Sequence, residues 1–264
     1  MKKVKEPEIF LVGITKMVSS GIKDYLNSIN NPNWKPDENV SDGENLIEMA
    51  GRMCYRSWQA YDENKKDATN KNVKRVRHGN KNYINNIIKS GHGSIFEHVN
   101  MSFIIKNLSR IASHELVRHR AGMAYSQESL RYVRLDELNF WIPDLLKYKS
   151  EDYICDIVNY LEQVQRTLQD EYQIDAIDDF NTKKALTSAF RRLAPMGLGT
   201  SIFVTGNIRA WRHIIEIRSS VHAEEEIRLI ARKIGHICKK EFPHLFQDME
   251  LNENNEWVFE KRKI

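Results

Sequence analysis

Cysteine, proline and glycine are scarce in this chain of 264 residues, which contains 3 Cys, 6 Pro and 12 Gly. So few turn-forming residues argue against an all-β protein with many tight turns. Cys54, Cys155 and Cys238 lie far apart, form no Cys-x-x-Cys pair and leave one cysteine over in any disulfide scheme. This cysteine usage is typical of a reducing compartment, so we expect a cytoplasmic location.

Long apolar runs are also missing, and the longest, such as residues 9–12, have the length of a strand. A helix that spans a bilayer needs roughly 20 consecutive apolar residues, so no membrane partner is expected. The basic start of the chain is not followed by the apolar stretch of a secretory signal peptide.

Several chemical signatures are absent from the sequence. It has no GxGxxG, GxxxxGK[ST], HExxH or GxSxG motif, so the usual nucleotide folds, zinc proteases and α/β-hydrolases have no support. The nine His and three Cys do not fall at metal-ligand spacings, and His92 and His98 are six residues apart. We therefore expect no metal site.

Charge and hydropathy indicate one folded domain. The net charge of +4 is too small to indicate a nucleic-acid partner, and 41% hydrophobic with 29% charged residues is typical of a globular chain. No Pro/Gly/Ser-rich linker divides residues 1–264, although residues 59–81 form a polar insertion whose basic run 74–78 we interpret as solvated. The expected fold class is α+β, a single domain with a mixed or antiparallel sheet and several long helices.

Hydrophobic periodicity predicts where the elements lie. Strands are expected at 8–13, 99–105 and 199–206. Ser109 and Asn207 are typical N-caps, which predicts helices that run from Ser109 into residues 118–120 and from Asn207 to Arg218. Further helices are expected at 44–58, 83–88, 143–172, 182–193 and 223–240.

The stretch 109–134 contains five Arg and no Lys: Arg110, Arg118, Arg120, Arg131 and Arg134. The planar guanidinium fork suits phosphate and carboxylate groups and stacks on flat rings better than an ammonium does. Small polar and aromatic neighbours add neutral donors and apolar walls. The composition therefore favours a site for an anionic, planar ligand, and the alternative is a helix end whose cations complement its dipole.

Three blocks in this region occur in a recognisable order. They are HGSIFEH at 92–98, SHELVRHR at 113–120 and YSQESLRY at 125–132. A distal set follows at Arg191, Pro195, 207–209, His213, Arg218, 222–224 and 226–228. Together they resemble the flavin-dependent thymidylate synthases, whose signature is Arg-His-Arg, seven residues, then Ser. The resemblance covers about residues 91–228.

The resemblance implies a role for each matching residue. Arg218 would lie against the uracil ring as the catalytic residue and favour its N3-deprotonated form. FAD would be held by His92, Ser94, Arg118, His119, Arg120, Gln127, Asn207, Arg209 and His213. The nucleotide would be held by Glu115, Arg118, Gln127, Ser129, Arg131, Arg191 and Arg218, with Ser129, Arg131 and Arg191 at its phosphate.

The activity that the resemblance implies is conversion of dUMP to dTMP. Methylenetetrahydrofolate would give the carbon, FAD would carry the hydride and NADPH would reduce the flavin. No cysteine lies in an Arg- or His-rich block that would activate its thiol, which agrees with a route that needs no enzyme nucleophile. The resemblance also implies a homotetramer with active sites between subunits.

Two departures from the family pattern keep alternatives open. Eight residues, not seven, separate Arg120 from Ser129, and Glu115 stands where a Gln is usual. We expect Glu115 to face the ribose or a neighbouring Arg such as Arg118 or Arg191. The alternatives are C5-hydroxymethylation of dUMP or a related pyrimidine nucleotide and, from a different class, a nucleic-acid-binding protein.

Helix geometry adds an expectation about residues 207–218. At 100° per residue, Arg218 lies on one face, whereas Arg209 and His213 lie on the other. We therefore expect Arg218 and the Arg209–His213 pair to serve two parts of a site, or two sites.

Overall fold

The centre of the molecule is an antiparallel sheet whose strands follow the alternation of apolar and polar residues. A computed structural model describes residues 2–3, 6–135 and 137–261. The strand order is β2-β3-β6-β4, with bounds Glu8–Ile14, Asn100–Ser109, Gly199–Asn207 and Met123–Gln127. The three predicted strands are confirmed, whereas β4 was not expected from the sequence.

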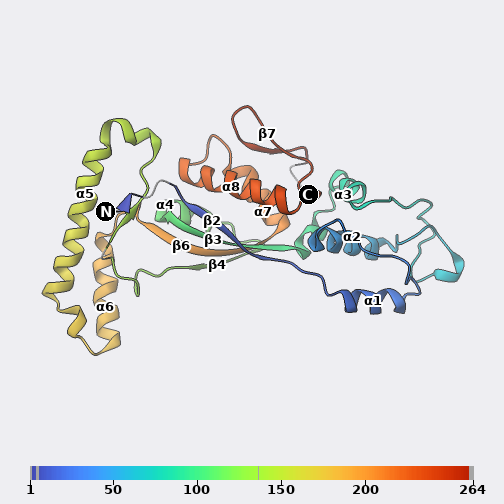
Figure 1. Cartoon of the computed structure of the whole chain (residues 1–264), viewed down its shortest axis with the longest axis horizontal. Helices are drawn as coiled ribbons and strands as arrows, with labels where there is room; N and C mark the ends of the chain where they lie inside the picture. The colour runs from blue at the N-terminus through green and yellow to red at the C-terminus, as the bar shows by residue number, and fades with distance from the viewer. Residues whose placement is uncertain (1, 4–5, 136, 262–264) are drawn as a thin grey trace.

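Eight α-helices in the described part of the chain lie at the two ends of this sheet and over one of its faces. They are α1 (Ser19–Ser28), α2 (Asp42–Tyr55), α3 (Asn80–Lys89), α4 (Arg110–Leu116), α5 (Asp144–Glu171), α6 (Phe180–Phe190), α7 (Ile208–Arg218) and α8 (Glu225–Glu241). Figure 1 places α5 and α6 at one end, α1 to α3 at the other, and α7 and α8 over one face of the sheet. The predicted α+β class is confirmed. No described helix is both long and apolar enough to cross a membrane.

Two short strand pairs lie outside the main sheet. β1 (Lys2–Lys3) runs parallel to β5 (Asn139–Phe140), and β7 (Met249–Leu251) pairs antiparallel with β8 (Trp257–Phe259). The main sheet is therefore antiparallel, one of the two expected arrangements, and the parallel pair is a separate sheet with two residues in each strand. The sequence analysis did not anticipate either pair, because strands of two or three residues are too short to show a period.

The covered face of the sheet forms the main core. Alternate residues of β3, Met101, Phe103 and Ile105, are fully buried. The ring of Trp211 from α7 meets that of Phe103 edge to face at 5.1 Å, and its indole N–H donates to the carbonyl of Met101. This packing fixes α7 against the sheet, so the residues at both ends of α7 have defined positions.

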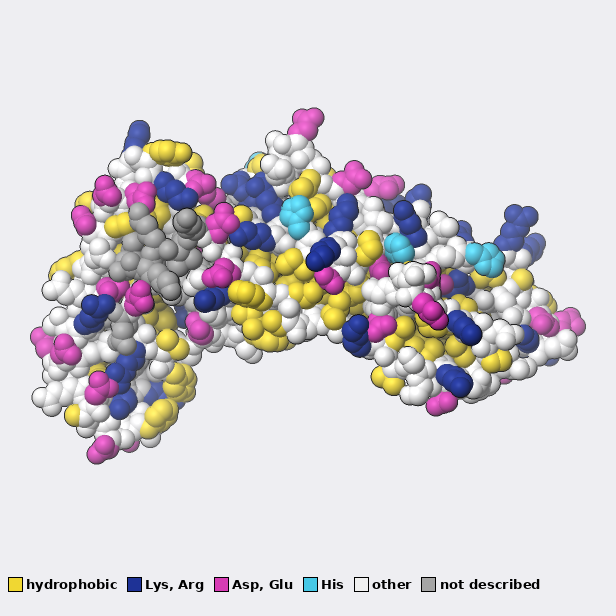
Figure 2. Space-filling model, in the orientation of Figure 1, with side chains coloured by type: hydrophobic (Ala, Val, Ile, Leu, Met, Phe, Trp, Pro, Cys, Tyr) yellow, Lys and Arg dark blue, Asp and Glu magenta, His cyan; other side chains and the backbone are white. Residues whose placement is uncertain are grey.

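The opposite face of the sheet is largely uncovered. Phe10, Ile104, Phe203 and Ser126 stand in register across all four strands. Phe10 is 45% exposed and Phe203 is 42% exposed. Figure 2 shows hydrophobic side chains gathered over the middle of the molecule, where the strands lie.

Both predicted N-caps are present, but the helix after Ser109 is shorter than expected. Ser109 and Asn207 accept from the backbone N–H groups of Ala112 and Ala210. α4 ends at Leu116 rather than continuing through residues 118–120. The physical reason is local: the His119 N–H turns back to the Leu116 carbonyl, and the Tyr125 hydroxyl donates to the His119 carbonyl at 2.7 Å, with the Leu116 carbonyl 3.0 Å away.

The polar segment 59–81 is mostly irregular, and part of it is buried. It contains one 3₁₀ turn, η1 (Glu63–Lys65), and α3 begins at its end. Ala68 is fully buried beside Leu26 and Trp58, and Thr69 is buried as well. A small apolar cluster thus holds part of the segment against α1 and α2.

Ser109 also connects α4 to α8 through a buried carboxyl group. Its backbone N–H donates to Glu226 at 2.7 Å, and its hydroxyl donates to the other Glu226 oxygen. Burial raises the pKa of Glu226 to about 7, although the two hydrogen bonds from Ser109 oppose this. The folded chain therefore keeps a proton that the unfolded chain releases.

We expect this proton to make stability fall as pH rises. Between the unfolded pKa of 4.5 and the folded value of about 7, the unfolded state binds fewer protons. The contribution of Glu226 is complete below pH 4.5 and is lost through pH 7, on the order of 3 kcal/mol in all. Glu226→Gln should remove this slope, which thermal unfolding between pH 4.5 and 7.5 measures. Glu241→Gln on the same helix is the control, and an unchanged slope in Glu226→Gln would contradict the assignment.

Candidate active site

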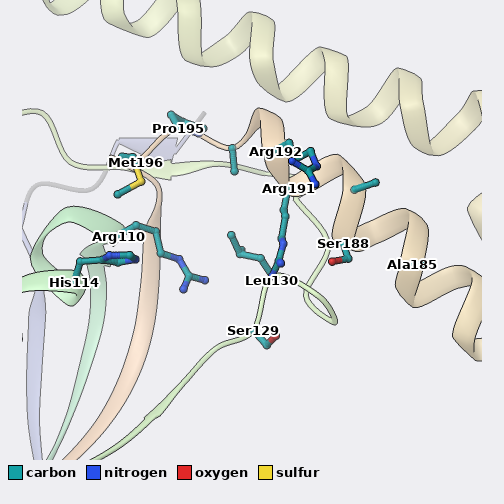
Figure 3. Close-up of a pocket in the computed structure, with 12 residues that line it drawn as sticks. Arg110, His114, Ser129, Leu130, Ala185, Ser188, Arg191, Arg192, Pro195 and Met196 are labelled. Atoms are coloured by element: carbon teal, nitrogen blue, oxygen red, sulfur yellow. The ribbon is translucent and has the colours of Figure 1, made fainter. Parts of the chain in front are cut away.

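A cation-rich cavity of about 620 Å³ lies between α4, the segment after β4, and α6 with the 3₁₀ turn η4 (Arg191–Leu193). Its polar lining comes from Arg110, His114, Ser129, Ser188, Arg191 and Arg192. None of the described residues that line it is acidic. Figure 3 shows the side chains of Arg110 and Arg191 extending into the same space. Such a cavity is suited to a small anion.

The cavity brings together two of the residues predicted to hold a phosphate group, Ser129 and Arg191. They are 62 residues apart in sequence, so the fold and not local spacing makes them neighbours. Arg131 is not among the lining residues, although its backbone N–H donates to the Ser129 hydroxyl at 3.3 Å. Its role at the phosphate stays a prediction.

A second cluster forms where the C-terminal ends of α4 and α7 meet. The Arg218 guanidinium donates from Nη1 to Glu115 at 2.7 Å and from Nε to His119 Nε2 at 2.9 Å. The expectation that Glu115 faces a neighbouring arginine is therefore confirmed, although that arginine is neither Arg118 nor Arg191, and a contact with the ribose stays a prediction. Its partner is Arg218, because the last turn of α4 lies against the last turn of α7.

His119 is held as a neutral ring in this cluster. Burial lowers its pKa to about 4, and the neighbouring charges of Arg218 and His213 act in the same direction. Because Nε2 accepts from Arg218, the proton of the neutral ring lies on Nδ1. The cluster therefore presents one fixed guanidinium and one imidazole N–H donor.

The expectation that Arg218 and Arg209 lie on different faces of α7 is confirmed. Arg209 is exposed and pairs with Glu97 at 2.6 Å, whereas Arg218 pairs with Glu115. His213 does not follow this division, because its ring lies 6.0 Å from that of His119, the residue that Arg218 contacts. His119 thus connects the two faces of the helix.

Gln127 lies beside the middle of α4, between the cavity and the cluster of Arg218, Glu115 and His119. Its side-chain N–H donates to the Ser113 hydroxyl at 3.0 Å. Arg118 and Arg120 are exposed in the turn that leads from α4 to β4. In the N-cap residue Asn207, Oδ1 is committed to the Ala210 N–H, so only Nδ2 is left for a ligand.

The segment from Arg120 to Ser129, which has one residue more than the family pattern, begins with this turn. Gly122 has a φ of +71°, and an added Cβ would lie 2.4 Å from the Asn207 side chain. The turn closes with the Met123 N–H on the Arg120 carbonyl, after which β4 pairs with β6 without a register shift. The residues after the turn, Met123–Gln127, therefore pair with β6 along their whole length.

His92 lies at a separate cavity of about 560 Å³. Its ring stacks on that of Tyr55 with centroids 5.7 Å apart, and the Tyr55 hydroxyl is 3.4 Å from His92 Nδ1. Residues 72–77 of the polar segment complete one wall. Ser94 is exposed in the 3₁₀ turn η2 (Gly93–His98) and does not line this cavity.

Sequence reasoning missed several residues of these sites. Arg110 was visible as one of the five clustered arginines, but composition did not distinguish it from Arg134, which pairs with Asp175 at 2.5 Å. His114, Ser188, Arg192 and Tyr55 carried no signal of their own.

The fold and the site define an enzyme scaffold of helices on an antiparallel sheet, with Arg- and His-rich cavities for anionic ligands. Residues 38–244 match the family model described as thymidylate synthase complementing protein. The chain is 35% identical over 222 residues to a flavin-dependent thymidylate synthase of Corynebacterium diphtheriae, which covers 82% of this chain and 83% of the relative. It is 31% identical over 260 residues to that of Corynebacterium aurimucosum, covering 95% and 94%.

A solved structure is also similar. It is a UMP/dUMP methylase, PolB from Streptomyces cacaoi, bound with 5-Br UMP. The TM-score is 0.60 at 16% identity, and the match covers 94% of this chain and 95% of that one. On the family model and the curated relatives, the chain belongs to the flavin-dependent thymidylate synthase family.

Proposed function

We propose that this chain converts dUMP to dTMP with methylenetetrahydrofolate as carbon donor, FAD as hydride carrier and NADPH as reductant. The observation that carries the proposal is the acid-free cavity in which Ser129 and Arg191 meet. The curated relatives are flavin-dependent thymidylate synthases, and the similar structure is a UMP/dUMP methylase, which supports this substrate class.

The chain's own residues account for binding the nucleotide. Arg191 and the Ser129 hydroxyl supply a guanidinium fork and a neutral donor for the phosphate. Gln127, held by Ser113, supplies an amide group that reads a polar edge of the ligand. A monoanionic or dianionic phosphate entering this cavity meets cations and no carboxylate, so its desolvation is compensated.

Arg218 is the residue proposed to act on the uracil ring. Its guanidinium is oriented by Glu115 and His119 before any ligand binds. A fixed cation at the ring stabilises negative charge on the deprotonated base without reorganising during the reaction. Neutral His119 adds a donor at Nδ1 without adding a second positive charge beside Arg218.

The residues present fit a flavin dinucleotide. The stacked rings of Tyr55 and His92 offer a flat wall, and exposed Arg118 and Arg120 offer cations for the pyrophosphate. His119, Asn207, Arg209 and His213 would complete the contacts, together with Ser94 and Gln127. Bound flavin would supply the hydride, which the protein's residues cannot.

Product analysis tests the proposal against its alternative. The purified protein should show the visible absorbance of a flavin and form dTMP from dUMP, methylenetetrahydrofolate and NADPH, with no product when any one is left out. Chromatography distinguishes dTMP from 5-hydroxymethyl-dUMP. The comparisons favour methylation. Absence of flavin and of turnover, with salt-dependent binding to polynucleotide, would instead support a nucleic-acid-binding protein.

We also propose a homotetramer in the cytoplasm. The support for assembly is the uncovered sheet face, with exposed Phe10 and Phe203 in one register row, because large apolar patches of this kind mark interfaces. Light scattering on the purified protein measures the assembly.

The support for the cytoplasmic location is three free cysteines, Cys54, Cys155 and Cys238.

A further inference from the structure

Arg110, the first residue of α4, has an incompletely satisfied guanidinium at the edge of the acid-free cavity. Its Nη2 donates to the Glu128 carbonyl at 3.0 Å, which fixes the direction of the side chain. Its Nε is buried and has no hydrogen-bond partner. A buried donor of a charged group left without a partner is costly, so a ligand that accepts from it would be bound favourably.

The carboxylate nearest to Arg110 is already committed elsewhere. Glu128 accepts from the Ser201 backbone N–H at 2.9 Å, and its own N–H donates to the Ser201 carbonyl. Glu128 therefore serves to hold the end of β4 against β6. Its charge favours the cation of Arg110 but its oxygens are turned to the backbone of β6.

Arg110 and Arg191 also repel each other across the cavity. Burial lowers the pKa of Arg110, the charge of Glu128 opposes this, and the charge of Arg191 lowers the pKa further. Figure 3 shows both guanidinium groups directed into one space, with Ser129 at its side. Two like charges held around a common cavity are stabilised when an anion lies between them.

A comparison within the chain shows that the unsatisfied Nε alone does not mark a site. Arg232 on α8 also has a buried Nε without a partner and donates to the Asn254 carbonyl. Its charged neighbours are one arginine, Arg228, and one carboxylate, Glu256, just as those of Arg110 are Arg191 and Glu128. What distinguishes Arg110 is the cavity beside it, whose described lining holds a second arginine and no carboxylate.

We propose that Arg110 is a phosphate-binding residue of the nucleotide site, acting with Arg191 and Ser129 on a nucleoside 5′-monophosphate. The proposal rests on the proposed function and adds a residue to it. Arg110 would donate from Nε and from the second N–H of Nη2, which lie on the same side of the guanidinium, to two phosphate oxygens, which satisfies the buried donor. Arg110 would thereby select for the phosphorylated nucleotide over the nucleoside.

The test compares dUMP with deoxyuridine, which lacks the phosphate, on the flavin-loaded protein by titration calorimetry. Arg110→Ala should weaken dUMP binding about 10- to 100-fold, the equivalent of one charge-assisted hydrogen-bonded pair, and change deoxyuridine binding less than about twofold. Arg110→Lys should weaken dUMP binding, but less than Arg110→Ala does, because lysine keeps the charge and loses the fork. Arg232→Ala is the matched control and should leave the dUMP-to-deoxyuridine ratio unchanged, with thermal unfolding confirming that each variant folds.

Two outcomes would overturn the proposal: unchanged dUMP affinity in Arg110→Ala, or equal weakening of dUMP and deoxyuridine. Failure of the proposed function is a different result, in which the unaltered protein does not bind dUMP. In that case the same variants are compared with inorganic phosphate as the ligand. Its binding is measured by the broadening of the ³¹P resonance. Loss of that broadening in Arg110→Ala alone would support the anion site, and its persistence would overturn it.

Discussion

Replacing Arg218 by Lys is expected to lower kcat for dTMP formation roughly 100-fold or more. Arg218 satisfies Glu115 and His119 with two different nitrogens of one planar group. A lysine ammonium keeps the charge but cannot hold both partners and face a ligand in the same geometry. Removal of one preorganised donor from a developing anion costs about 10²- to 10³-fold in kcat in enzymes of other kinds. Steady-state kinetics with saturating folate and NADPH measure the effect.

Two further variants separate orientation from charge. Glu115→Gln keeps an oxygen that accepts from Arg218 Nη1 and removes the negative charge, so its kcat should fall less, about 3- to 10-fold. Arg232→Lys, at a partly buried arginine of α8, should change kcat less than about twofold. Wild-type turnover in Arg218→Lys would exclude Arg218 from the chemistry. A larger loss in Glu115→Gln than in Arg218→Lys would show that Glu115 itself contacts the substrate.

The local parts of this fold could be predicted from the sequence because their signals are local. The apolar alternation of β3 and the capping side chains of Ser109 and Asn207 each act within a few residues. The strand β4 could not be predicted in this way. Its residues Met123–Gln127 are held by pairing with β6, more than 70 residues further along the chain.

The partners within the site could not be predicted for the same reason. Glu115 and Arg218 are 103 residues apart, and only the tertiary fold brings the end of α4 to the end of α7. Sequence reasoning expected Glu115 to face the ribose or a neighbouring arginine such as Arg118 or Arg191, and it did not name Arg218. The contact with Arg218 adds a role for the carboxylate, because it orients that guanidinium.

Asp248→Ala, which breaks the buried ion pair between Asp248 and Arg212 of α7, should lower the free energy of unfolding by about 3–5 kcal/mol. Arg212 donates to both carboxylate oxygens at 2.8 and 2.7 Å, and the two side chains are only 5% and 3% exposed. Its guanidinium also lies over the Phe259 ring at 4.3 Å. Removing the carboxylate would leave an arginine charge in an apolar setting, which costs far more than the hydrogen bonds alone.

Urea unfolding of single and double variants measures this effect and identifies its cause. Lys106→Ala, which breaks the exposed Lys106–Glu8 pair, should cost less than about 1 kcal/mol. The double variant Arg212→Met with Asp248→Leu should recover most of the loss, because it removes both charges and keeps apolar volume. A double variant as unstable as Asp248→Ala would show that the pair is needed for its geometry and not merely for its neutrality. Since α7 carries Arg218 at its end, kcat of the double variant then reports whether this pair also sets the position of the site.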